Sequence, residues 1–182
     1  MKNKKLQISL FEFLQSGWFG PLTPKRNCSP EDITKIFGQP DSIEMYGPIG
    51  PNGPYRAGDE RCFPVILAYG VIEFHFDAPL LMYTLFSDCF FSGRPRGGPL
   101  KLTDTALLRH SRPLNEFLIL AKSRGLEIRS VVPTQPPLAV ILTTSEGVTL
   151  HFEHQDASAP GSQPTLRAFS WAHDFRDRSS PA

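Results

Sequence analysis

One apolar pattern occurs twice in this chain, and the repetition limits the folds that it can adopt. Residues Val65–Phe86 read VILAYGVIEFHFDAPLLMYTLF, and Val140–Trp171 opens VILTTSEGVTLHFEHQ and closes LRAFSW. Each copy runs from an apolar stretch through Gly-Val to a His-Phe-acid triplet, then ends in another apolar, aromatic stretch. We therefore expect the chain to build one supersecondary unit twice.

Within both copies, alternation of apolar and polar residues predicts a strand with one buried face. Side chains two positions apart on a strand lie on the same side of the sheet, so the apolar set should face the core. The apolar sets are Ile72, Phe74, Phe76 and Val148, Leu150, Phe152; the polar sets are Glu73, His75, Asp77 and Thr149, His151, Glu153.

Helix signals precede each set of strands. Apolar residues at helical spacing predict a short amphipathic helix from about Ile8 to Gly17, with Trp18 and Trp171 anchoring the core. Ser29, followed by Pro30 and by Asp32, is typical of a helix N-terminus, and Gly38 and Pro40 should end that helix. A third helix is expected to begin at Pro113 and to end at Gly125.

The expected fold class is α+β, with two tandem helix-plus-four-strand repeats, an antiparallel sheet or sheets, and helices packed on one face. The pattern does not decide between one sheet shared by both repeats and two packed subdomains. We expect a first repeat over 1–91, a linker over 92–101, a second repeat over 102–174 and a frayed tail over 175–182. The expected strands are Ser42–Tyr46, Phe63–Tyr69, Val71–Asp77, Leu80–Phe86, Leu126–Val132, Leu138–Thr144, Val148–Glu153 and Leu166–Trp171.

Composition narrows the function classes. A formal charge of +1 over 182 residues argues against a dedicated nucleic-acid or anionic-membrane binder. Cys28, Cys62 and Cys89 form no CxxC pair, which indicates free thiols in a reducing compartment. The apolar run near the N-terminus is interrupted by Glu12 and Gln15, and no stretch reaches the roughly 20 apolar residues of a membrane span. We expect a cytoplasmic protein without a membrane segment.

The usual sequence motifs of catalysis are missing. The chain contains no Gly-x-Ser-x-Gly elbow, no phosphate-binding G-x-x-x-x-G-K loop and no G-x-G-x-x-G. No cofactor is therefore expected, and the sequence favours a non-enzymatic protein, with an enzyme kept as an alternative.

Two candidate binding regions stand out. The first is the polar sheet face, with Glu73, His75, Asp77, Thr149, His151 and Glu153. Three interpretations of this face stay open: a solvated strand face, a polar surface for protein recognition, and a metal site or acid–base cluster of His75, His151 and His154 with the acids. The second region is the loop GPIGPNGPY at 47–55, where Pro51, Asn52 and Tyr55 are the candidate contacts.

The first half of the chain resembles a known bacterial pattern. A helix ending in Phe37-Gly38-Gln39-Pro40-Asp41 before a strand meander is similar to the repeat of the SmpA/OmlA and beta-lactamase-inhibitor-protein group. That resemblance implies tandem helix-plus-four-strand units whose concave sheet grips another protein. The opening SLFEFLQSGWFGPLTP is similar to small bacterial cytoplasmic proteins, some of them plausible immunity proteins. The lipoprotein cysteine of SmpA/OmlA proteins is missing near the N-terminus, so their outer-membrane role is not implied.

Together these observations predict a non-enzymatic protein-binding module, most specifically an immunity or inhibitor protein that occludes a bacterial toxin. The alternatives are a small enzyme or metal-binding protein that uses the His/acid face, and a small-ligand-binding protein. The sequence does not predict an oligomeric state.

Overall fold

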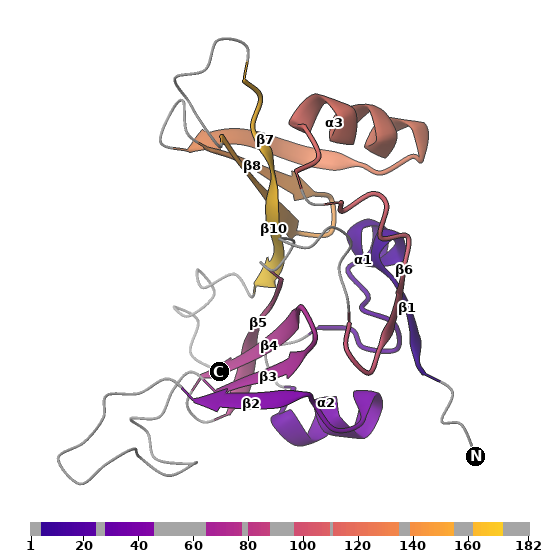
Figure 1. The fold of residues 1–182 in the computed structure, drawn as a ribbon, viewed down its shortest axis with the longest axis vertical. Coiled ribbons are helices and arrows are strands. Elements are labelled where there is room, and N and C mark those ends of the chain that lie inside the picture. The colour runs from indigo at the N-terminus through magenta and orange to yellow at the C-terminus, as the bar shows by residue number, and fades with distance from the viewer. Residues whose placement is uncertain are drawn as a thin grey trace, which may run out of the picture.

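The computed structural model describes residues 5–24, 28–45, 65–77, 80–87, 97–109, 111–134, 139–154 and 162–172. Within these ranges the chain forms three helices and ten strands (Figure 1). The helices are α1 (Leu10–Ser16), α2 (Pro30–Phe37) and α3 (Leu114–Ser123). None of the helices in these ranges is long and apolar enough to cross a membrane.

Eight of the strands form one sheet in the order β2-β3-β4-β5-β10-β9-β8-β7, and every neighbouring pair is antiparallel. The bounds are β2 Ser42–Met45, β3 Val65–Tyr69, β4 Ile72–Asp77, β5 Leu81–Ser87, β7 Ile128–Thr134, β8 Ala139–Thr144, β9 Val148–Glu153 and β10 Thr165–Ala172. The α+β class with a large antiparallel sheet is therefore confirmed.

Strands from both halves of the sequence belong to this one sheet. Helix α2 precedes β2 to β5 in the chain, and α3 precedes β7 to β10. The two groups of strands meet at the centre of the sheet, where residues 84–87 of β5 pair with residues 169–172 of β10. Of the two arrangements that the sequence left open, the structure has the shared sheet.

A second, smaller sheet was not predicted. Strand β1 (Gln7–Ser9) pairs in parallel with β6 (Lys101–Thr103), and Figure 1 shows both strands beside α1. Ile8, expected in the first helix, is the central residue of β1. Lys101, expected to end the linker, is the first residue of β6, and the preceding Leu100 is buried.

The predicted core positions of the large sheet are confirmed. All six apolar residues of the two alternating sets, which lie on β4 and β9, have no exposed surface. The pair registers place both sets on the same side of the sheet, because Phe74 lies opposite Leu85, Leu85 opposite Trp171, and Trp171 opposite Val148. We call this side the inner face and the opposite side the outer face.

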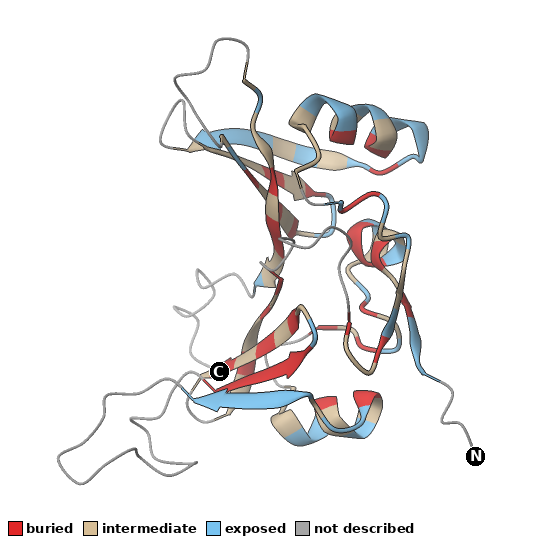
Figure 2. Cartoon of the chain, in the orientation of Figure 1, coloured by how far each residue is buried: buried red, intermediate tan, exposed pale blue. Residues whose placement is uncertain are grey.

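An aromatic residue from each helix contacts the inner face. Phe37 of α2 stacks on Phe74 with ring centroids 5.5 Å apart, and Phe117 of α3 meets Phe152 at 5.5 Å. Phe13 of α1 lies 6.0 Å from Phe169, on the central strand β10. Figure 2 shows the buried residues of α2 and α3 on the sides turned toward the rest of the molecule. These rings fill the space between the helices and the sheet.

The sequence signals at the helix ends act as expected. The Ser29 side chain accepts a hydrogen bond from the Asp32 backbone N–H, and the Asp32 carboxylate accepts one from the Ser29 backbone N–H, which completes a capping box. These hydrogen bonds from Ser29 hold the pKa of Asp32 below its usual value. Gly17, at φ 72°, ends α1 in the left-handed conformation that glycine adopts without strain.

The Phe37–Asp41 segment has a structural role at the junction of α2 and the sheet. The Gly38 backbone N–H donates to the Thr34 carbonyl at 2.9 Å, and the Gly38 carbonyl accepts from the Tyr69 hydroxyl at 2.7 Å. The Asp41 carboxylate accepts from the Gly70 backbone N–H at 2.7 Å. Burial, together with the Asp41 charge, raises the pKa of Tyr69 to about 12. The motif therefore fixes the helix end onto the β3–β4 turn.

Two local predictions were wrong. Trp18 does not anchor the core: its side chain is 53% exposed, while the adjacent Phe19 is fully buried. The chain reverses between Phe19 and Leu22, whose backbones exchange two hydrogen bonds, and this turn directs Phe19 inward. Strand β7 also continues through Pro133 to Thr134, beyond the predicted strand end at Val132. An edge strand tolerates proline because one side of its backbone has no partner strand.

Candidate functional site

The outer face brings residues from both halves of the chain into one row. Glu73 on β4 lies opposite Phe86 on β5, and Phe86 lies opposite Ser170 on β10. Ser170 lies opposite Thr149 on β9, which extends the row into the second half of the chain. Two of the predicted binding residues, Glu73 and Thr149, thus share a cross-strand row. The complete row is Glu73, Phe86, Ser170, Thr149, Thr143 and Ser130, and each of these side chains is half-buried.

At the β4 end of the row, His75 is held by a carboxylate and two aromatic rings. Its Nε2 lies 2.8 Å from the Glu73 Oε2, two residues earlier on the same strand. The rings of Tyr83 and Phe86 meet the imidazole edge to face, each with centroids 6.0 Å apart. The His75 side chain is 15% exposed and that of Glu73 25%. These contacts fix the imidazole in one orientation while leaving part of it accessible.

In the middle of the row, on β10 and β9, the neighbouring polar groups are hydroxyls and not a carboxylate. The Thr149 Oγ1 lies 2.7 Å from the Ser170 Oγ, and the His151 Nε2 lies 3.4 Å from the same Ser170 atom. Burial lowers the pKa of His151, although the nearby Glu153 charge opposes that effect. Near pH 7 His151 is therefore a neutral hydrogen-bonding group.

The two histidines share the outer face but do not converge. His75 lies opposite Thr84 on β5, and Thr84 lies opposite Ala172 on β10, so His75 belongs to a second cross-strand row. His151 lies opposite Ala168 of β10 and belongs to a third. Along β10 these rows are four residues apart, and β4 and β9 are three strand spacings apart, so the imidazoles are separated by roughly 20 Å. Among the described residues, no group of three His, Cys, Asp or Glu side chains could hold a metal ion. The geometry does not support a metal site or an acid–base cluster formed by both histidines.

The remaining candidate residues lie in different surroundings. Asp77 is half-buried and Glu153 is exposed, and each lies two residues beyond its histidine, farther from the shared row. His154 bonds through Nδ1 to the Ser162 Oγ at 3.1 Å. Pro51, Asn52 and Tyr55, with the rest of the loop at 47–55, lie outside the described residues.

Sequence reasoning missed Phe86 and Ser170, which complete the row between Glu73 and Thr149. Both residues lie in strands that were predicted, at β5 and β10. Their partners depend on the register of the central β5–β10 pair, where the two halves meet. In β10 the small residues Ala168, Ser170 and Ala172 alternate with the aromatic residues Phe169 and Trp171. This alternation is the local signal that the small residues lie on the outer side.

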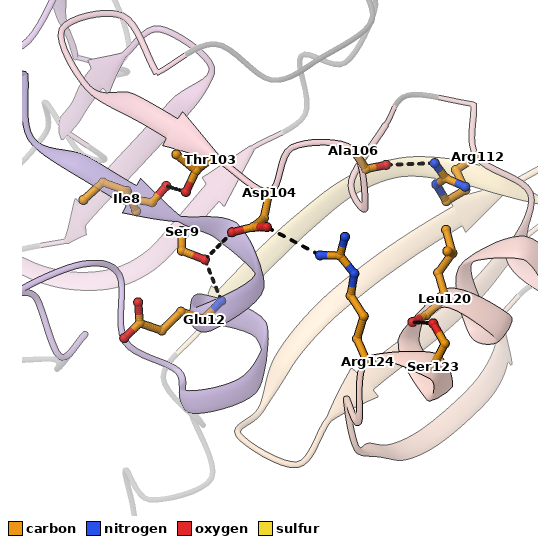
Figure 3. A network of polar contacts seen from close by, with 10 residues as sticks. All are labelled: Ile8, Ser9, Glu12, Thr103, Asp104, Ala106, Arg112, Leu120, Ser123 and Arg124. Atoms are coloured by element: carbon orange, nitrogen blue, oxygen red, sulfur yellow. Dashed lines mark hydrogen bonds and ion pairs between the residues drawn. The ribbon is translucent and has the colours of Figure 1, made fainter.

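A polar cluster outside the sheet faces joins the N-terminal segment to α3 (Figure 3). The Ser9 Oγ donates to the Asp104 Oδ2 at 2.8 Å while it accepts the Glu12 backbone N–H at 3.1 Å. Arg124, at the end of α3, reaches the Asp104 Oδ1 at 3.5 Å. Because every group here contacts another element of the same chain, we interpret the cluster as structural.

A surface pocket of about 210 Å³ lies near the start of α3, lined by Arg109, Ser111, Arg112, Pro113 and Glu116. The Arg112 guanidinium lies 3.2 Å from the Glu116 carboxylate and donates to the Ala106 carbonyl at 2.8 Å. These contacts use the guanidinium to hold the turn before α3, so the outer face remains the better candidate site.

Comparisons of this chain with protein-family models, with curated proteins and with solved structures each find no match.

Proposed function

We propose that this protein is a non-enzymatic binding module and that its outer sheet face contacts another protein. The most specific form of the proposal is a cytoplasmic immunity or inhibitor protein that occludes a bacterial toxin. The partner is a polypeptide, and neither a nucleic acid nor a membrane, because a formal charge of +1 offers little attraction for polyanions.

The row from Glu73 to Ser130 is the observation that carries this proposal. It crosses six neighbouring strands and combines a carboxylate, an aromatic ring and four hydroxyls on one side of the sheet. A broad surface of half-buried polar and aromatic groups suits recognition of another surface, whereas a small-molecule site is normally a concave pocket.

The side chains of this face are preorganised for binding. The imidazole of His75 is fixed by Glu73, and the hydroxyl of Thr149 is fixed by Ser170. A partner that docks here orders few additional rotamers, and each ordered side chain would otherwise cost about 0.5–1.5 kcal/mol. Binding of this kind works by occlusion, because a rigid face covers the partner without any bond chemistry.

We also propose the finer reading of the fold as two tandem helix-plus-four-strand repeats with their helices on one face. The matching order of α2 with β2 to β5 and α3 with β7 to β10 supports the proposal, as does the matching parity of β4 and β9. The ring contacts of Phe37 and Phe117 with the inner face support a common side for the helices.

The enzyme alternative receives less support. A shared acid–base or metal site would need His75 and His151 within reach of one substrate, and their strand positions keep them apart. The Glu73–His75 pair could transfer a proton by itself, but it lies on a broad sheet face.

The proposal is tested by co-expressing the chain with the product of the gene beside its own. We expect the two proteins to copurify as a complex of fixed stoichiometry, and we expect the chain to relieve the toxicity of the neighbour. A control strain expresses the neighbour with an unrelated small protein. Failure to copurify, together with unrelieved toxicity, would contradict the proposal.

A further inference from the structure

The two edges of the eight-stranded sheet differ in their ability to accept another strand. Edge strand β2 is exposed at all four positions, and no strand of the described residues pairs with its outer side. Ile43 and Met45 belong to the inner face, because they lie opposite Leu67 and Val65. They are 59% and 43% exposed, whereas Leu67 and Val65 are buried. The apolar inner layer therefore reaches the edge at β2 without being covered there.

The opposite edge, β7, carries features that block pairing. A β-bulge interrupts its register between Ile128 and Ser130, and Pro133 lies near its end. Proline has no backbone N–H to donate, and a bulge breaks the regular spacing of the backbone groups. Natural sheets use both devices to prevent edge-to-edge association. The described part of β2 contains no proline or bulge.

We infer that β2 is the contact between two copies of this chain, which pair edge to edge as an antiparallel, two-fold dimer. An antiparallel strand is complementary to itself across a two-fold axis, so the same four residues supply both sides of the contact. Because β7 is blocked, pairing through β2 closes at two copies and does not continue into a filament. This inference is independent of the proposed function, because the contact lies at the sheet edge and leaves the outer face open.

Charge and packing select one register for the dimer. Pairing centred on Ile43 places the two Ile43 side chains opposite each other and sets Glu44 opposite Ser42 of the second copy. Pairing centred on Glu44 would instead oppose two carboxylates, which is unfavourable for directly facing residues. In the register centred on Ile43, the apolar inner layer of one copy continues into that of the other.

Sedimentation of the full chain tests this inference directly. A contact of four residues per copy is small, and interfaces below about 1,200 Å² are typical of weak association. The experiment therefore covers protein concentrations from about 10 to about 500 µM. We expect the weight-average mass of the wild type to rise with concentration and to level off at twice the monomer mass. Ile43→Lys should remain monomeric throughout, because it places two charges opposite each other at the axis.

The matched control is Ile119→Lys, which changes an equally apolar and 68% exposed residue on α3 and should dimerise like the wild type. Met45→Asp provides a second edge variant, because in this register residue 45 lies opposite Asp41 of the second copy, and two facing carboxylates disfavour pairing. Circular dichroism verifies that each variant is folded. The inference is overturned if the wild type stays monomeric at every concentration, if both folded edge variants still dimerise, or if the mass grows beyond two copies.

Discussion

Tyr69 has the clearest individual role in the fold. Its ring is fully buried between Phe37 and Phe74, with centroids 5.9 and 5.7 Å away. Its hydroxyl donates to the carbonyl of Gly38, the residue that ends α2. One side chain thus joins the core to the helix end.

Tyr69→Phe should lower the free energy of unfolding by about 1 kcal/mol, because it keeps the ring and removes one hydrogen bond. Urea denaturation monitored by circular dichroism measures the change. Glu127→Ala is the control, because Glu127 is an exposed side chain and its removal should change stability by less than about 0.5 kcal/mol. An unchanged stability in Tyr69→Phe would contradict this role.

His151 should make the stability depend on pH. Burial lowers the pKa of His151 in the folded protein, whereas a histidine in the unfolded chain has a pKa of about 6.5. The unfolded chain therefore binds the proton more tightly than the folded protein does. Above that pKa both states are neutral and the residue has no effect. As the pH falls through about 6.5 stability is lost, and the loss levels off below the folded pKa.

Urea denaturation at about pH 7.5 and about pH 5.5 measures this effect. The stability lost between these two pH values should be smaller in His151→Gln than in the wild type, because glutamine does not titrate. An equal loss in both proteins would show that His151 is not desolvated in the folded state.

At the scale of elements, the turn after β6 connects the N-terminal segment to α3. Asp104 adopts φ 56°, a left-handed conformation that Asn and Asp tolerate better than most side chains. Its two carboxylate oxygens contact Ser9, the N-cap of α1, and Arg124, the C-cap of α3. The same residue therefore joins the ends of two helices.

Two substitutions separate these contributions. Asp104→Asn should cost less than about 1 kcal/mol, because it removes only an exposed ion pair and keeps an oxygen for Ser9. Asp104→Ala should cost about 1–2 kcal/mol more, because alanine disfavours the left-handed backbone. Thermal or urea unfolding distinguishes the two. Equal costs would contradict a role for the backbone conformation.

Local patterns predicted most of the elements. The alternation in β4 and β9 identified all six buried positions, and Ser29 with Gly38 marked the ends of α2. Strands β1 and β6 were missed because each has three residues, too few for a periodic pattern, and they pair across about ninety residues of sequence. The row of the outer face was only half predicted, because it depends on the register between β5 and β10.

At the scale of the whole molecule, the N-terminal segment packs against both halves of the sheet. Phe13 contacts Phe169 on β10, and it also contacts Phe19 at 5.4 Å. Phe19 in turn contacts Phe37 and Phe74 of the first half, each at 5.9 Å. These rings connect β10 to β4 and α2 beside the short central strand pair. We expect the two halves to unfold as one unit.

Phe13→Ala should lower the free energy of unfolding by about 3–5 kcal/mol, because it leaves a cavity where both halves meet. Phe11→Ala, at a half-buried ring of the same helix, should lower the free energy of unfolding by less, and urea denaturation measures both changes.

Urea unfolding of the wild type, monitored by tryptophan fluorescence and by circular dichroism, should give coincident transitions. Two separate transitions would contradict a connection between the halves.

The outer face is the surface through which the molecule is proposed to act, and its binding affinity tests that claim most directly. Isothermal titration calorimetry measures the Kd for the product of the neighbouring gene with the wild type, with Thr149→Arg on the row and with Ser145→Arg in the exposed β8–β9 turn. Circular dichroism verifies that all three are folded. A large charged side chain at the centre of a binding face should weaken binding about 100-fold or more, whereas the turn variant should bind like the wild type. If folded Thr149→Arg binds as tightly as the wild type, the partner does not contact the outer face.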